Sequence, residues 1–404
     1  MRDDPEPIER RVVRRTARSR AQPSPADQAA LPDEPQRRFD LAWVLVAYGV
    51  SRLAVFFVAT VATWYARPLS VVDGLTGWDA SWYLRIAREG YADSLANEGF
   101  GNRWGFFPAL PGLIRFVNQA TPFDWETSGV LVALIVGGLA VIAVYLAVRE
   151  ILGRRVALAT ATLICFLPNA YTLSMVYTEG LFLACAGFCL YFLSRRRWEL
   201  AGLAALLGGT TRSAGVVLIA CCAFEGVRAA FGDRSWRPLT APLIAPLGLV
   251  GVMTLAWVRI GEPLAFVKAQ EAWNNEFDWF RPFYRGATGV LTEGASWVNA
   301  QSVVATSAVL VALLGVGVMM RTGGIPAIWW IYSIGILVVA ISPVWLSPVP
   351  RYLLPAFPLA AVVINRLPET ARTPLISASG VMMGALALGT FTSIVNWQSA
   401  PLFP

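Results

Sequence analysis

An aspartate between two tryptophans is the most promising catalytic residue in this 404-residue sequence. Asp79 lies in the stretch GWDASWY, directly after Trp78 and three positions before Trp82. A carboxylate held rigidly among aromatic rings can act as a general base that removes a proton from a hydroxyl group. Asp79 can equally be the N-cap of a helix that begins there. The local sequence leaves both roles open.

Six basic residues fall on or near the side of the chain where membrane proteins usually avoid positive charge. They are Arg103, Arg212, Lys268, Arg281, Arg285 and Arg351, and Lys268 is the sole lysine. Guanidinium groups bind phosphate oxygens through paired hydrogen bonds and remain charged in a low-dielectric site. The set therefore suits an anionic lipid headgroup, such as a phosphate on an isoprenoid tail. Any single member can instead extend to the interface or pair with a nearby acid.

Further candidates for substrate contacts accompany these charges. Glu179, in MVYTEGLF, falls at an expected membrane boundary, where it either caps a helix or orients a substrate or an arginine. Trp82, Trp273 and Tyr352 are candidates for substrate binding, by stacking on a sugar face or by bracing the site.

The residues that are missing exclude several kinds of chemistry. The chain has no histidine, which removes imidazole bases, histidine metal sites and Ser-His-Asp triads. Its five cysteines all lie in apolar runs, where cysteine behaves as a small buried apolar residue. No Walker or GxGxxG loop is present, so no nucleotide cofactor is predicted, and neither is nucleic-acid binding. No metal ligands are predicted either, although a divalent cation is left open.

The composition is that of a membrane protein. Hydrophobic residues make up 56% and charged residues 15% of the chain, and the mean hydropathy is +0.55. Soluble proteins are close to 45–50% apolar and about 25% charged. We predict about eleven transmembrane helices from apolar runs at 41–66, 127–148, 156–175, 179–194, 199–210, 213–231, 238–258, 302–320, 325–345, 352–366 and 373–395.

Arginines indicate how these helices are oriented. Every second connection is rich in arginine, which predicts that these connections and the N-terminus are cytoplasmic. The residues are Arg149, Arg154, Arg155, Arg195, Arg196, Arg197, Arg228, Arg234, Arg237, Arg321, Arg366 and Arg372. The candidate site residues then fall on the extracytoplasmic side. We expect a multi-pass protein of the cell membrane.

Two regions differ in character from the spans. Residues 1–39 are rich in arginine and proline, have few large apolar residues, and are predicted to form a disordered cytoplasmic tail. Residues 40–404 are predicted to form the transmembrane domain, with large extracytoplasmic loops at 67–126 and 259–301. In the first loop, WDASWYLRIAREGY has the pattern of an amphipathic helix that lies in the membrane interface.

Five motifs, in order, resemble those of one known family. They are WDASWYLRIAREGY with FFPALPGLIR, MVYTEGLFLA, TTRSAGVVL, GEPLAFVKAQEAW and SPVPRYLLPAFPL, which extend from about residue 50 to about residue 360. Together they resemble the PIG-V-like mannosyltransferases, which include the second mannosyltransferase of GPI-anchor synthesis and bacterial relatives. That family has the multi-spanning GT-C glycosyltransferase architecture. The chain departs from the family pattern in having TEG for SEP and GEP for GDP, and a single acid at its WD site.

The resemblance implies an inverting glycosyltransferase. Its donor would be polyprenyl-phosphate-mannose, and its acceptor an extracytoplasmic glycolipid or glycan. The catalytic acid of such enzymes corresponds to Asp79, and the residues facing the donor phosphate to Arg212 and Arg351, with Lys268 as a further candidate. Two alternatives from other classes are a flippase or transporter of lipid-linked sugars and a catalytically silent scaffold of the same fold. A flippase needs charges deep in the bilayer, and the predicted spans contain few.

Overall fold

The computed structural model describes residues 34–64, 70–96, 98, 101–273, 288, 292, 297–342 and 348–396. These residues form helices and connecting segments, with no strand among them. The chain divides into two compact units, Met1–Asp40 and Leu41–Pro404. All site residues belong to the second unit. Most of the predicted tail, residues 1–33, lies outside the described residues.

Six helical stretches are long and apolar enough to cross a membrane, judged by length and composition. They are Gln36–Trp64 in α1 (Glu34–Trp64), Trp125–Leu152 (α5), Gly215–Asp233 (α9), Arg237–Ile260, Ser302–Met320 in α14 (Trp297–Met320) and Glu369–Val395 in α18 (Glu369–Asn396). Arg237–Ile260 consists of η3 (Arg237–Leu239), α10 (Thr240–Ile244) and α11 (Leu247–Ile260). The protein is therefore a multi-pass membrane protein.

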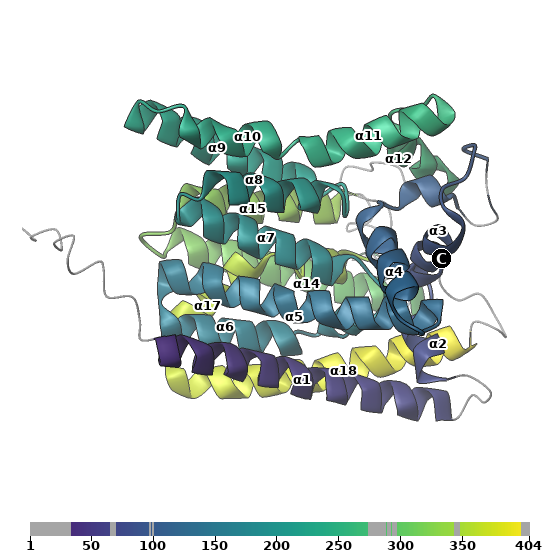
Figure 1. Ribbon diagram of the computed structural model, residues 1–404. Coiled ribbons are helices and arrows are strands. Elements are labelled where there is room, and N and C mark those ends of the chain that lie inside the picture. The colour runs from purple at the N-terminus through teal and green to yellow at the C-terminus, as the bar shows by residue number, and fades with distance from the viewer. Residues whose placement is uncertain are drawn as a thin grey trace, which may run out of the picture. The chain divides into compact units, whose positions relative to one another are not determined.

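Shorter helices fill the remaining predicted spans. They are α6 (Arg154–Phe166), α7 (Glu179–Ser194), α8 (Trp198–Gly209), α15 (Ala327–Ile341) and α17 (Phe357–Arg366). Each of the eleven predicted spans thus coincides with helix, although several of these helices are short for a full crossing. The long helices run from left to right in Figure 1.

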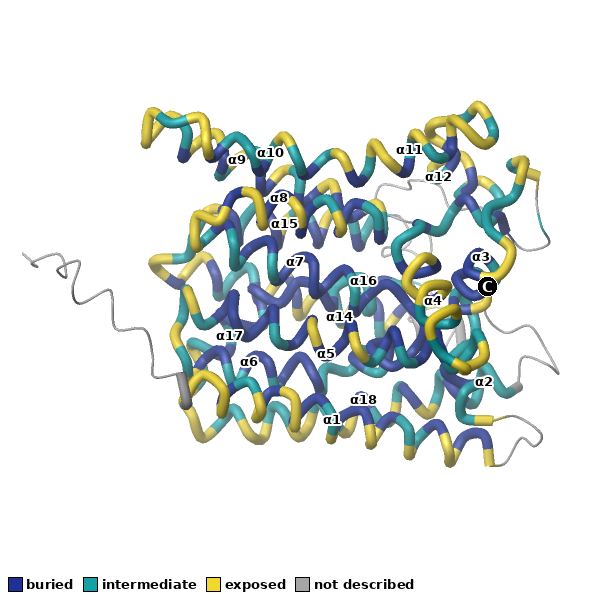
Figure 2. The backbone as a smooth tube through the Cα atoms, in the orientation of Figure 1, coloured by how far each residue is buried: buried dark blue, intermediate teal, exposed yellow. Residues whose placement is uncertain are grey.

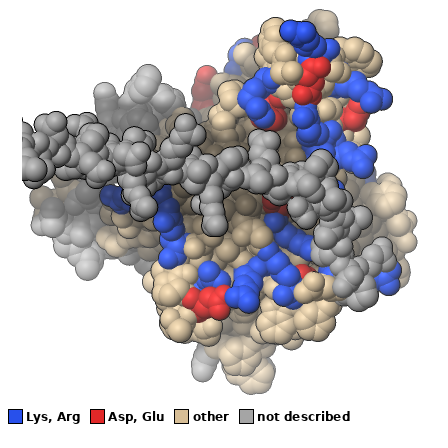
Figure 3. All heavy atoms as spheres, turned by 90° about the vertical axis from the view of Figure 1, so that its left-hand side faces the viewer, with Lys and Arg blue, Asp and Glu red and all other residues tan. Residues whose placement is uncertain are grey.

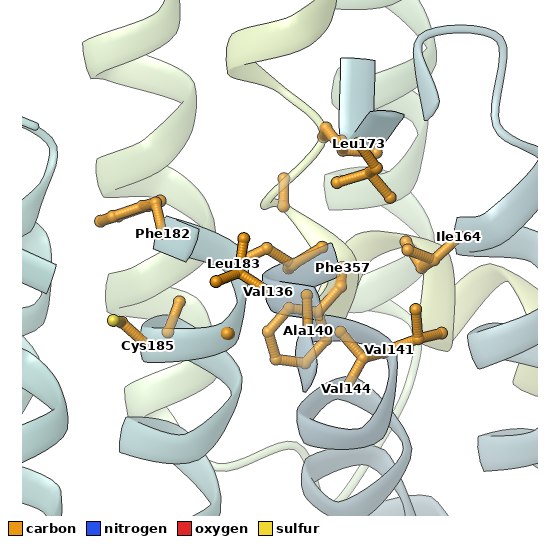
Figure 4. Close-up of a cluster of buried hydrophobic side chains, with 14 of the residues drawn as sticks. Val136, Ala140, Val141, Val144, Ile164, Leu173, Phe182, Leu183, Cys185 and Phe357 are labelled. Carbon is orange, nitrogen blue, oxygen red and sulfur yellow. The ribbon is translucent and has the colours of Figure 1, made fainter. Parts of the chain in front are cut away.

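The centre of the second unit is a tightly packed group of helices. In Figure 4, apolar side chains of α5, α6, α7 and α17 meet with Leu173 of the 3-10 helix η2 (Ala170–Ser174). Small residues allow α5 and α7 to approach closely, because an added side chain at Gly180 would lie 3.3 Å from the Gly137 backbone. Figure 2 shows the same pattern, with α5 and α7 largely buried. This packing holds the N-terminus of α7, and therefore Glu179, in a fixed position.

A segment that is not α-helical passes through this core. Helix α6 ends at Phe166, just before Pro168, because proline cannot donate the backbone hydrogen bond that would continue the helix. Residues 170–178, most of them buried, then lead into α7. Irregular backbone is tolerated at membrane depth only where protein groups satisfy it. Arg52 of α1 does so by donating to the Ala170 carbonyl at 2.7 Å and to the Ser174 hydroxyl at 3.0 Å.

The first large loop folds into four short helices at one end of the bundle. They are α2 (Val71–Leu75), α3 (Asp79–Glu89), η1 (Arg103–Gly105) and α4 (Ala109–Ala120), and Figure 1 shows α2, α3 and α4 at the right-hand end. Helix α3 is the predicted amphipathic helix. It buries Tyr83, Leu84 and Ile86 and exposes Arg88 and Glu89. The second loop contains α12 (Ala265–Lys268) and η4 (Ala269–Trp273), and most of its remainder lies outside the described residues.

The arginine-rich connections lie at the end of the bundle opposite the first large loop. The links that follow α5, α7, α9, α14 and α17 are at the left-hand side of Figure 1. Figure 3 looks onto that side and shows several patches of basic side chains, with acidic side chains beside them, on a surface made up mostly of other residues.

Candidate functional site

The first helix of the site begins at Asp79. Trp78 has the N-cap position of α3, with φ 60° and ψ −129°, and its side chain makes no capping hydrogen bond. This backbone conformation is costly for a residue with a side chain, and such strain is concentrated at functional sites. Asp79 is the first helical residue instead of the cap. Its carboxylate pairs with the guanidinium of Arg351.

Arg351 lies in the short helix α16 (Val349–Tyr352), within the proline-rich segment PVPRYLLP that precedes α17. Prolines restrict this segment, and the side-chain amide of Asn169 donates to the Pro350 carbonyl. The Arg351 guanidinium also lies 4.7 Å from the ring centre of Tyr177, a cation–π contact. The arginine is thus held from the α6–α7 segment as well as from its own helix.

Glu179 is the first residue of α7 and is buried. Its Oε1 atom lies 3.3 Å from Nη1 of Arg212 and 3.7 Å from Nε of Arg351. Among the described residues its other oxygen, Oε2, has no hydrogen-bond partner. A buried carboxylate is costly unless it is paired, so the two guanidiniums account for its presence here.

Arg212 lies in the tight turn between α8 and α9. An added side chain at Gly215 would lie 2.5 Å from the Gly209 Cα atom, so this turn requires glycine. The Arg212 guanidinium stacks over Tyr352 at 4.5 Å from the ring centre and approaches Phe182 at 5.8 Å. Tyr352 contacts both arginines, since the guanidinium of Arg351, its neighbour in sequence, is 5.3 Å from the centre of the same ring.

Four charged groups thus form a row in which acid and base alternate. Asp79, Arg351, Glu179 and Arg212 are linked in that order, and their formal charges cancel. Coulombic interactions in a partly buried site are stronger than in water. The row can therefore bind an anion at its guanidiniums and accept a proton at its more accessible carboxylate. We call these four residues the charged row.

The structure brings together most of the residues predicted for the site. Asp79, Arg212, Arg351, Glu179 and Tyr352 meet in or beside the charged row. Trp82 instead stacks on Phe106 at 5.8 Å between ring centres, on the same helix as Asp79. Its predicted contact with substrate stays a prediction.

Of the four candidates from the second loop, the structure describes the side chain of Lys268. Lys268 pairs with the adjacent Glu262 at 2.6 Å, and its side chain is about half exposed. Trp273 ends η4, and its side chain lies outside the described residues, as do the candidates Arg281 and Arg285 in full. Arg103, another predicted candidate, pairs with Glu98 and Glu89 within the first loop.

Three residues that the sequence analysis missed also support the site. Tyr177 contacts Arg351. It lies two positions before Glu179 in the motif MVYTEG, so the motif that indicated Glu179 could also have indicated Tyr177. Arg52 is buried inside α1, and an arginine within an apolar run is itself a signal of function. Asn169 offers no comparable signal, because only its contact with Pro350 reveals its role.

Metal ligands require several side chains of suitable type in one place. Within the described ranges, no group of three or more histidine, cysteine, aspartate or glutamate side chains gathers in that way. The two carboxylates of the charged row are each paired with arginine.

Comparisons with known proteins point to one class of fold. The profile of the dolichyl-phosphate-mannose-protein mannosyltransferase family matches residues 108–258, which is less than half of the chain. A search of curated proteins gave no match. Among solved structures, ArnT from Cupriavidus metallidurans bound to undecaprenyl phosphate is similar with a TM-score of 0.52 and 16% identity, over 88% of this chain and 76% of that one.

A second similar structure is the Archaeoglobus fulgidus oligosaccharyltransferase tethered with an acceptor peptide. It matches with a TM-score of 0.48 and 14% identity, over 87% of this chain. This chain spans 55% of that longer protein. The similarity to ArnT confirms the all-α, GT-C-like membrane fold expected from the sequence. The narrower resemblance to PIG-V-like enzymes stays a prediction.

Proposed function

We propose that the protein is an integral-membrane inverting glycosyltransferase. It would move a sugar from a polyprenyl-phosphate donor to a hydroxyl group of an extracytoplasmic glycolipid or glycan. One observation carries this proposal: the Asp79 carboxylate and the guanidiniums of Arg351 and Arg212 belong to one linked row of charges. The matched family profile and the similarity to ArnT, which was crystallised with undecaprenyl phosphate, support it.

Asp79 is the proposed general base. It begins an amphipathic helix at one end of the bundle, and its side chain is the most exposed of the charged row, so an acceptor hydroxyl can reach it. The base accepts the hydroxyl proton while the hydroxyl oxygen attacks the anomeric carbon from the face opposite the leaving group. That direction of attack inverts the configuration.

Arg351 and Arg212 are the proposed phosphate-binding residues, with Lys268 and Glu179 in supporting roles. The bond between the anomeric carbon and the phosphate oxygen breaks, and its electron pair remains on the phosphate. Guanidiniums already in place face this growing negative charge, and such preorganised donors lower a barrier by about 3–4 kcal/mol each. Glu179 contacts both arginines and so keeps them together.

The positions of the charges favour an enzyme over a transporter. The charged row lies at the ends of helices, opposite the arginine-rich connections, which supports an extracytoplasmic site by the positive-inside rule. The one arginine deep in α1, Arg52, is fully occupied with backbone carbonyls and hydroxyls, so it does not line a path for substrate.

Mannose is the proposed sugar, because the sequence motifs resemble those of mannosyltransferases and the matched profile carries the same activity in its name. The test compares the rates at which the purified full chain transfers sugar from radiolabelled polyprenyl-phosphate-mannose and from the corresponding glucose donor. Preference for glucose would contradict the sugar assignment and leave the catalytic residues untouched.

The decisive experiment is transfer by Asp79→Asn. We expect the rate to fall by about 100-fold or more, because general-base catalysis typically contributes that much. Asp93→Asn is the matched control, since Asp93 is an exposed acid of the same loop. A folded Asp79→Asn protein that transfers sugar at the wild-type rate would remove Asp79 as the base.

Arg351→Ala tests the phosphate site. We expect the KM for the donor to rise by about 10-fold or more, because a charged hydrogen bond to the donor is lost. Arg196→Ala is the control, since Arg196 is exposed and pairs with Asp233 at the opposite end of the bundle. Equal effects of the two substitutions would contradict the assignment.

A further inference from the structure

Arg351 faces both the proposed base and the proposed leaving group. In the structure its guanidinium pairs with Asp79 on one side and lies 3.7 Å from Glu179 on the other. While the pair with Asp79 holds, the carboxylate oxygen Oδ2 is occupied by the guanidinium and is not free to accept a proton from a hydroxyl group. The same pair keeps the guanidinium from a donor phosphate. In this arrangement the proposed base and the proposed phosphate-binding group therefore block each other.

We propose that the donor phosphate displaces Asp79 from Arg351 and so activates the base. This inference rests on the proposed function, and it adds a control mechanism: Asp79 is competent only after the donor has bound. Arg351 is then a coupling residue as well as a phosphate-binding one.

The exposure of the two carboxylates indicates which partner is exchanged. The Asp79 side chain is 30% exposed, whereas that of Glu179 is 2% exposed. An accessible carboxylate can regain hydrogen bonds with water or an acceptor hydroxyl, but a buried one cannot. Glu179 also keeps Arg212 at 3.3 Å. Arg351 can therefore release Asp79 and still retain a buried anionic partner.

The charge balance of the reaction favours the same exchange. The acceptor hydroxyl loses its proton to Asp79, which becomes neutral. The electron pair of the broken carbon–oxygen bond goes to the phosphate, which gains one negative charge. A negative charge thus disappears beside one side of Arg351 and appears on the phosphate that it binds. Arg351, already bound to the phosphate, then faces the group that gains the charge, and the protonated carboxyl group of Asp79 no longer competes for it.

The test is the affinity of the full chain for farnesyl phosphate, measured by calorimetry in detergent. If Asp79 competes for Arg351, then Asp79→Asn should bind this probe at least about five-fold more tightly than wild type, the lower end of typical coupling between sites. Asp93→Asn should bind as wild type does. Farnesol, which lacks the phosphate, should bind the wild type and Asp79→Asn equally.

A double variant isolates the coupling. Arg351→Gln should weaken binding of farnesyl phosphate, and adding Asp79→Asn to it should give no gain, because the competition acts through Arg351. Unchanged or weaker binding by Asp79→Asn would overturn the exchange, and so would a gain that persists in the Arg351→Gln background. If Asp79→Asn does not fold, Asp79→Ala makes the same comparison.

These outcomes are separate from those of the proposed function. If Asp79→Asn is inactive but binds farnesyl phosphate with wild-type affinity, Asp79 remains the base and the exchange is refuted. A variant that stays fully active would refute the base, whatever its affinity for the probe.

Discussion

The guanidinium of Arg351 pairs with the carboxylate of Asp79, although 272 positions separate the two residues in the sequence. Asp79 begins the amphipathic helix α3, and Arg351 lies in the last turn before α17. Glu179 and Arg212 extend the pair into the charged row. The predictions below concern the residues that hold this row in place and the loop that surrounds it.

Replacing Glu179 should disturb both arginines. Glu179→Gln removes the negative charge between two guanidiniums, and breaking a buried pair typically costs about 3–5 kcal/mol. We expect a lower thermal unfolding midpoint and a fall in transfer of at least about 10-fold, measured on purified protein. Glu369→Gln, an exposed acid that pairs with Arg155, should change neither value. Wild-type stability of Glu179→Gln would show that the arginines do not depend on this carboxylate.

Arg52 should matter for stability through the segment it supports. Arg52→Leu leaves the carbonyls of Ala170 and Cys165 without their donor, and a hydrogen bond to a charged group contributes about 1.5–3 kcal/mol. We expect a clear fall in the unfolding midpoint, together with reduced transfer, because this segment leads directly to Tyr177 and Glu179. Leu53→Ala, at an exposed neighbouring position, should have little effect. A larger fall in the unfolding midpoint for Leu53→Ala than for Arg52→Leu would contradict this role.

Two glycines of α11 offer a matched test of helix packing. A side chain at Gly248 would lie 1.9 Å from the Leu206 carbonyl oxygen, whereas one at Gly251 would meet nothing within 4 Å. Gly248→Ala should therefore lower the unfolding midpoint, since α8 and α11 must separate to admit the methyl group. Gly251→Ala should leave it unchanged or raise it slightly, because alanine favours helix by about 1 kcal/mol. Equal midpoints would contradict the close contact.

The first loop should respond to pH through Glu98. Burial by itself raises the pKa of Glu98, but hydrogen bonds and the positive charge of Arg103 outweigh it, so the pKa lies below its ordinary value. A carboxyl group with a lowered pKa stabilises the folded state above the pKa of the unfolded chain. That contribution is lost as the pH falls through the folded-state pKa.

Glu98→Gln should therefore lower the unfolding midpoint at pH 7, and the difference from wild type should shrink below about pH 4, near the ordinary pKa of glutamate. Thermal unfolding at a series of pH values measures this. Asp93→Asn serves as the control, because Asp93 is exposed and only loosely paired with Arg259. A difference that stays constant with pH would show that charge is not its cause.

Much of the fold was predictable, because each membrane helix needs a long apolar run of its own. Each of the eleven predicted spans contains helix, six of the helical stretches are long and apolar enough to cross a membrane, and the amphipathic pattern of WDASWYLRIAREGY marks α3. Helix lengths were less predictable. In the predicted span 156–175 the α-helix ends at Phe166, since Pro168 stops it, and the backbone that follows is satisfied by a side chain of α1. That contact depends on packing between distant segments.

The sequence by itself determined that this is a helical membrane protein without imidazole chemistry, and it marked Asp79, Glu179, Arg212 and Arg351 one at a time. Composition and periodicity are local properties of the chain, so they can be read directly from the sequence. Only the tertiary structure decided that these four side chains form one row, that Trp78 is the N-cap and leaves Asp79 to pair with Arg351, and that Lys268 pairs with Glu262. Pairing of charges depends on distances of a few ångströms between helix ends, and those distances are set by how the helices pack.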